Sequence, residues 1–162
     1  MKENILLTLQ FIILVLVQVL LFNKIHIFGL GCIFIYIFFI INYPFEHNKI
    51  YLVLLGFLLG FIIDMFSQSY GLHTLATTLI AYLRPFIIKL YVGSNDTEVL
   101  RKSYSVFYRY AITMILLHHL TLFFLEAFSL KFFFPVMFKT LISTFLTTIF
   151  VFFVQSVLIK RR

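Results

Sequence analysis

Long apolar runs of similar length recur along the whole of this 162-residue chain. A helix that crosses a bilayer needs about 20 mostly apolar residues, and the runs repeat near that length. Hydrophobic residues make up 62% of the chain and charged residues 12%. A soluble domain carries about 25% charged residues, so this chain cannot cover a soluble fold with polar side chains. We therefore predict an integral membrane protein, with a single domain over residues 1–162.

The apolar runs divide into six predicted transmembrane helices, which are joined by short polar turns. We place these helices at about 4–22, 27–43, 50–66, 71–92, 104–128 and 134–159. The predicted fold class is all-α, a polytopic membrane protein. The one longer polar stretch, 93–103, contains Asn95-Asp96-Thr97-Glu98, a pattern typical of a helix N-cap. It is either a solvated helix start or a docking handle for a cytoplasmic partner.

The distribution of lysine and arginine predicts the orientation, because cytoplasmic loops carry an excess of these residues. With the N-terminus inside, nine basic residues near the span ends lie on the cytoplasmic side and three lie outside. The nine are Lys2, Lys49, Lys89, Arg101, Lys102, Arg109, Lys160, Arg161 and Arg162, and the three are Lys24, Lys131 and Lys139. We expect both termini to be cytoplasmic. The net charge of +7 then reflects topology, and no nucleic-acid partner is expected.

Within the third predicted helix, Gly56, Gly60 and Asp64 are spaced four residues apart. Successive i, i+4 positions lie about 40° apart around a helix, so the three share one face, and Leu59 points about 100° away from it. Glycines let a neighbouring helix approach closely, whereas a central aspartate costs about 2.5–3.5 kcal/mol in a membrane. We predict a helix-packing or partner face, with Asp64 turned towards protein or water. The alternative is a helix-end aspartate that reaches the polar turn at 67–69.

Arg84 lies inside the fourth predicted helix, thirteen residues past Gly71. That spacing places it about 20 Å along the helix from the outer side. Arg84 either pairs with Asp64, directly or through water, or extends to the cytoplasmic headgroups beside Lys89. His73 is a further candidate partner for Asp64.

The other ionisable residues within the spans form no catalytic or metal-binding pattern that we recognise. His118 and His119 are adjacent and about 100° apart, so they cannot both face one metal ion, and we expect hydrogen bonds between helices. Glu126 is expected to interact with Lys131 or with water. The single cysteine, Cys32, excludes an intrachain disulfide. We predict a protein without enzymatic activity, cofactor or metal.

A resemblance to a known family begins at Gly56, Gly60 and Asp64, which we call the ladder. It continues to Tyr82, in GFLLGFIIDMFSQSYGLHTLATTLIAY. This stretch resembles the MreD family of rod-shape-determining membrane proteins. The resemblance rests on Gly56, Gly60, Asp64, the turn with Ser67, Ser69 and Gly71, and Ile80-Ala81-Tyr82. The six spans also fit, as do Gln18, Pro44 and the basic tail at 160–162.

The resemblance implies a non-enzymatic scaffold of the bacterial cell-elongation machinery, which serves rod shape and peptidoglycan synthesis in the inner (cytoplasmic) membrane. The implied partners are membrane lipids, a bitopic MreC-like protein and, indirectly, MreB and the RodA–transpeptidase synthase; a homo-oligomer stays open. The family is also similar in fold to the S-components of energy-coupling-factor transporters. The alternative is therefore an S-component that binds a vitamin-sized substrate. That function needs a polar-lined outer pocket, whereas the predicted outer turns are short and poor in polar groups.

Overall fold

The computed structural model describes residues 2–25, 31–45, 47–93, 100 and 103–158, which form helices and no β-strand. The α-helices are α1 (Lys2–Leu20), α2 (Ile37–Asn42), α3 (Lys49–Ser67), α4 (Leu72–Val92), α6 (Tyr104–Ala127) and α7 (Phe133–Leu158). Two short 3-10 helices, η1 (Phe22–Lys24) and η2 (Leu130–Phe132), follow α1 and precede α7. The predicted N-cap at 95–98 lies outside the described residues.

Five of the helices, α1, α3, α4, α6 and α7, are long and apolar enough to cross a membrane. They match five of the six predicted spans to within a few residues. Large apolar side chains are exposed along their outer surfaces, for example Leu9 on α1, Phe57 on α3 and Phe145 on α7. In a bilayer these side chains face lipid. The chain is thus an all-helical, multi-pass membrane protein.

The second predicted helix, 27–43, is wrong in most of its described length. Residues 32–34 have no regular secondary structure, and the helix α2 begins only at Ile37. The segment is nevertheless the centre of the fold, because Tyr36, Ile37, Ile40 and Ile41 are all completely buried. Irregular backbone at membrane depth is tolerated only where protein surrounds it, and this segment meets that condition.

Polar side chains of α1 and α7 take the place of the missing helical hydrogen bonds. Gln18 accepts from the Ile35 N–H at 2.9 Å and donates to the Ile33 carbonyl at 3.0 Å. Ser143 and Thr147 on α7 accept from the N–H groups of Cys32 and Phe34 at 3.0 and 3.2 Å. Because buried backbone groups need partners, these three side chains make an extended segment stable inside the bundle.

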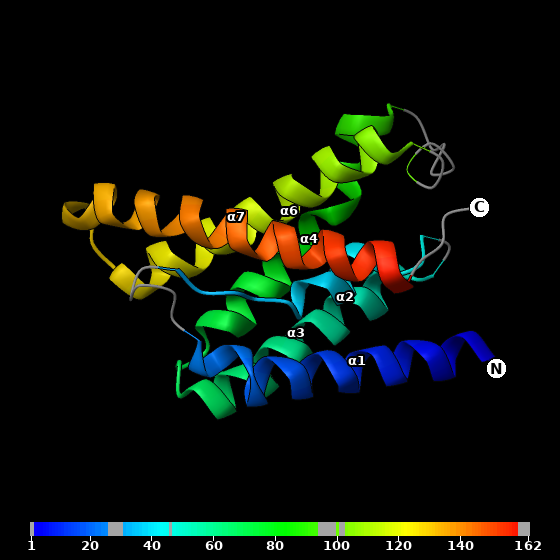
Figure 1. Ribbon diagram of the computed structural model, residues 1–162, viewed down its shortest axis with the longest axis horizontal. Coiled ribbons are helices and arrows are strands. Elements are labelled where there is room, and N and C mark those ends of the chain that lie inside the picture. Colours follow the sequence, from blue (N-terminus) through cyan, green and yellow to red (C-terminus); the bar gives the residue numbers. More distant parts are fainter. Residues whose placement is uncertain (1, 26–30, 46, 94–99, 101–102, 159–162) are drawn as a thin grey trace.

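The helices form an elongated bundle in which α1 begins and α7 ends at the same end (Figure 1). We call the opposite end the turn end: it contains η1, the α3–α4 turn at 68–71 and η2. The segment 31–42 returns the chain from the turn end, and its helix α2 contacts α1, α4 and α6. The most extensive helix pair is α3 with α4, and α6 packs against both α4 and α7.

Candidate functional site

The predicted packing face of α3 lies against α4 of the same chain. A Cβ atom at Gly56 would lie 3.0 Å from the Ala81 Cβ, and one at Gly60 would lie 2.5 Å from the Thr74 Cα. Gly56, Gly60 and Asp64 are all buried in this contact. The ladder is therefore an internal helix-packing face, and it is not available to a partner protein in this conformation. Leu59, which was expected to point away, is also completely buried in the core.

Asp64 closes the α3–α4 turn by holding the first turn of α4. Its Oδ1 accepts from the Ser69 hydroxyl at 2.6 Å and from the His73 N–H at 3.0 Å. Its Oδ2 accepts from the N–H and the hydroxyl of Thr74 at 2.8 and 2.5 Å. The N-cap residue of α4 is Gly71, which has no side chain to serve these N–H groups. Asp64 thus acts as an N-cap supplied by another helix, and its charge lies at the positive end of the α4 dipole.

Arg84 does not pair with Asp64, and it does not extend to the headgroups. It is only 5% exposed, and its guanidinium donates to the carbonyls of Tyr43, at 2.5 Å, and Ile41, at 3.5 Å. Its Nε donates to the Tyr110 hydroxyl at 2.9 Å. Carbonyls at the end of a helix lack intrahelical partners and carry partial negative charge. Arg84 therefore caps the C-terminal end of α2, just as Asp64 caps the N-terminal end of α4.

A second polar cluster links the buried segment to α4 and α6. The Tyr36 hydroxyl lies 2.7 Å from Nδ1 of His73 and 2.9 Å from Nε2 of His118. His119 contacts the Ile115 carbonyl through Nδ1, at 2.7 Å, and Thr147 of α7 through Nε2, at 3.2 Å. The two adjacent histidines thus face different neighbours and join helices through hydrogen bonds. His73 meets Asp64 through its backbone N–H, and its ring belongs to this separate cluster.

A cavity of about 550 Å³ opens at the turn end, between the ends of α1, α3 and α6 and the beginnings of α4 and α7. This volume is in the range of small-molecule pockets, about 300–1,000 Å³. Its apolar wall consists of Val19, Phe22, Ile25, Phe34, Phe66, Leu72, Leu122 and Phe123. Its polar lining consists of Asn23, Lys24, Cys32, Ser67, Ser69, His73, Glu126 and Lys139. Four of these polar residues, Asn23, Lys24, Ser67 and Ser69, lie in turns that were expected to be poor in polar groups.

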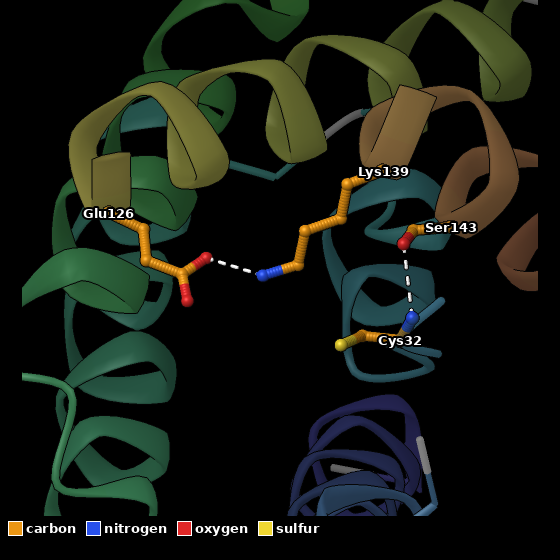
Figure 2. A network of polar contacts seen from close by, with 4 residues as sticks. All are labelled: Cys32, Glu126, Lys139 and Ser143. Atoms are coloured by element: carbon orange, nitrogen blue, oxygen red, sulfur yellow. Dashed lines mark hydrogen bonds and ion pairs between the residues drawn. The ribbon is translucent and has the colours of Figure 1, made fainter. Parts of the chain in front are cut away.

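The polar side chains of the cavity come from segments that are distant in sequence. Lys139 of α7 donates to Glu126 of α6 at 2.7 Å, and Figure 2 shows the two side chains pointing toward one another. Glu126 thus forms its ion pair with Lys139 and not with Lys131. Asn23 donates to the Ser67 hydroxyl at 2.8 Å and so joins η1 to the end of α3.

Comparison of the chain with protein-family models, with curated proteins and with solved structures gives no match. Within the described residues, no three His, Cys, Asp or Glu side chains gather closely enough to hold a metal ion. Sequence reasoning missed the cavity because its polar residues come, one or two at a time, from six different segments of the chain. The one available signal was that Lys24, Lys131 and Lys139, with Glu126, were all expected at the outer ends of spans.

Proposed function

We propose that this protein is a non-enzymatic scaffold of the bacterial cell-elongation machinery, of the kind that the MreD family represents. In this proposal it lies in the cytoplasmic membrane and binds a bitopic MreC-like protein. Through that partner it connects to MreB and to the RodA–transpeptidase synthase. The turn end then faces outward.

The observation that carries the proposal is that several residues responsible for the resemblance lie in one close contact between α3 and α4. Gly60 lies against the first two turns of α4, Gly56 lies against Ala81, and Ser69 donates to Asp64. A spacing shared only by chance has no reason to form one connected unit. The motif therefore corresponds to a specific helical hairpin, in which α3 packs closely against α4. This supports a fold shared with the MreD family and, with it, a shared function.

The same contacts remove the glycine face from the surfaces that a partner could reach in this proposal. Because α4 covers the glycine face, the MreC-like protein contacts another, lipid-facing surface of the bundle. The glycines act indirectly, since they set the position of α3 and α4 and hence the shape of that outer surface. Loss of the close α3–α4 contact is therefore expected to weaken partner binding, although no residue that contacts the partner is removed.

Co-purification tests the scaffold proposal directly. The tagged protein is expressed at its native level in its own bacterium, extracted in dodecyl maltoside and analysed by mass spectrometry. We expect a single-span MreC-like protein to co-purify, and depletion of the protein to turn rod-shaped cells round. The same tag on an unrelated multi-pass protein of that membrane is the control and should recover no MreC-like protein. Unchanged cell shape with no MreC-like protein in the eluate would contradict the proposal.

Reporter fusions test the orientation that the proposal requires. A cytoplasmic reporter after Arg162 and a periplasmic reporter inserted at Gln68 should both be active, because the basic residues predict inner termini. Activity of a cytoplasmic reporter at Gln68 would reverse the assigned orientation of the bundle.

A second candidate function, an S-component that binds a vitamin-sized molecule, is favoured by the cavity at the turn end. A cavity of this volume at the predicted outer face is what substrate capture requires. The purified protein would then release a water-soluble ligand on heat denaturation, and it would co-purify with an ATP-hydrolysing module. Extraction and mass spectrometry of the heated sample distinguish this function from the scaffold, for which no such module is expected.

A further inference from the structure

The charges around the turn-end cavity do not balance. Among the described residues, two lysines, Lys24 and Lys139, and one glutamate, Glu126, line it. The nearby Asp64 carboxylate accepts four hydrogen bonds from Ser69, His73 and Thr74, and it is not among the described residues that line the cavity. Lys24 forms no ion pair with any residue that the structure describes. The described lining residues therefore carry one positive charge in excess, which favours a singly charged anion.

Lys139 is held in place by more than its ion pair. Its ammonium lies 4.3 Å from the centroid of the Phe123 ring, in a cation–π contact, as well as 2.7 Å from Glu126. The two side chains of the ion pair remain 30% and 51% exposed, and such pairs contribute at most about 1 kcal/mol. An incoming anion can therefore replace the Glu126 carboxylate at low cost, while the Phe123 ring keeps the ammonium in position.

The rest of the wall suits an apolar group attached to that anion. Phe22, Phe34, Phe66 and Phe123 line the cavity beside the charged end. Burial of an apolar group against them contributes about 25 cal/mol per Å² of surface removed from water. The His73 ring uses Nδ1 for Tyr36, and no described residue bonds to its Nε2. This nitrogen remains available to a polar atom of the ligand.

From these features we propose that the cavity binds an amphiphilic monoanion, a phosphate or carboxylate group carried on an apolar body, with Lys139 and Lys24 as its charge partners. Glu126 occupies Lys139 when the ligand is absent and releases it when the anion binds. Two sources supply this chemistry: an anionic membrane lipid, whose headgroup enters while its chains stay between helices, or a soluble amphiphilic acid. The inference rests on neither of the functions proposed above, because a lipid-regulated scaffold and a binding protein both use such a site.

Native mass spectrometry of the protein released from dodecyl maltoside micelles tests the proposal with two probes. Dioleoyl phosphatidylglycerol represents the membrane source and octanoate, a singly charged carboxylate, the soluble source. Their controls are dioleoyl phosphatidylcholine and octyltrimethylammonium, which carry similar chains without a net negative charge. We expect saturable one-to-one binding of at least one anionic probe and no such binding of the controls. Binding of only one anionic probe identifies the source. Absence of both, or equal binding of the controls, overturns the proposal.

The proposal predicts opposite changes in affinity for the anionic probe when Lys139 and Glu126 are substituted. Lys139→Gln removes a charged hydrogen-bond donor and should weaken binding of the anionic probe about ten- to a hundredfold. Lys139→Arg should restore most of that loss. Glu126→Gln removes the competing carboxylate and should tighten binding about three- to fivefold. Lys131→Gln, at an exposed lysine outside the cavity, is the matched control and should have no effect.

The sign at Glu126 separates a binding site from a structural ion pair. If Lys139 and Glu126 only hold α7 against α6, both substitutions should reduce thermal stability and neither should tighten binding. Weaker binding in Glu126→Gln, or unchanged binding in Lys139→Gln with an intact circular dichroism spectrum, would overturn the assignment of these residues.

Discussion

Replacement of Gly60 by alanine should open the α3–α4 contact that organises the turn end. The added Cβ would lie 2.5 Å from the Thr74 Cα and 2.6 Å from the His73 carbonyl oxygen, and it would overlap the Thr77 hydroxyl. Two of these three atoms are backbone, so no side-chain rotation relieves the overlap. Restoring an ordinary contact of 3.4 Å requires the helices to separate by about 0.9 Å.

That separation also breaks the contacts of Asp64. Its carboxylate accepts from the His73 and Thr74 N–H groups at 3.0 and 2.8 Å, and an extra 0.9 Å takes both beyond hydrogen-bond distance. Overpacking costs about 1–3 kcal/mol, and alanine returns at most about 1 kcal/mol through its higher helix propensity. Because the cap is lost as well, we expect Gly60→Ala to lower the free energy of unfolding by about 3 kcal/mol.

Gly56→Ala is the matched comparison, because its Cβ would lie 3.0 Å from Ala81 and 3.2 Å from the Thr77 carbonyl oxygen. A shift of about 0.4 Å relieves both contacts, and the helix-propensity gain offsets most of the strain, so the net change should stay within about 1 kcal/mol. Unfolding of the purified variants in mixed micelles of dodecyl maltoside and dodecyl sulfate, followed by circular dichroism, measures the difference. Equal stability of Gly60→Ala and the wild type, or a larger loss in Gly56→Ala, would refute the argument from backbone contact.

Three further predictions concern the buried polar residues. Asp64→Asn should lower the free energy of unfolding by about 2 kcal/mol, because an amide nitrogen would face N–H donors that now meet a carboxylate; an unchanged midpoint in the same micelle assay would mean that the cap contributes nothing. Arg84→Gln should lower the free energy of unfolding by a similar amount, because the hydrogen bonds to Tyr110 and to the end of α2 are lost. The double variant with Asp64→Asn should show additive losses, since the two sites lie about 15 Å apart along α4. Partial recovery in the double variant would instead reveal coupling between them. Gln18→Leu should cost about 2–4 kcal/mol, because it leaves the Ile35 N–H and the Ile33 carbonyl unpaired; faster amide exchange confined to the segment 31–36 provides the local readout, and protection equal to wild type would exclude the proposed role of Gln18.

Two features of the chain were predictable from local sequence. Apolar length defines a spanning helix whatever its neighbours, and five of the six predicted spans are present for that reason. The i, i+4 spacing of Gly56, Gly60 and Asp64 defines a shared helix face, because the geometry of one helix is independent of the rest of the fold. The sequence therefore determined that a close helix contact forms here, although it did not identify α4 as the partner.

Tertiary structure decided the features that depend on residues far apart in the chain. The apolar run before Pro44 has the composition of a spanning helix, yet 32–34 are irregular because Ser143 and Thr147, 111 and 113 residues away from their partners, accept its N–H groups. No local pattern reports a hydrogen bond of that separation. Asp64 and Arg84 likewise bond to the ends of other helices rather than to each other, because backbone groups at helix ends compensate a buried charge as an ion partner does.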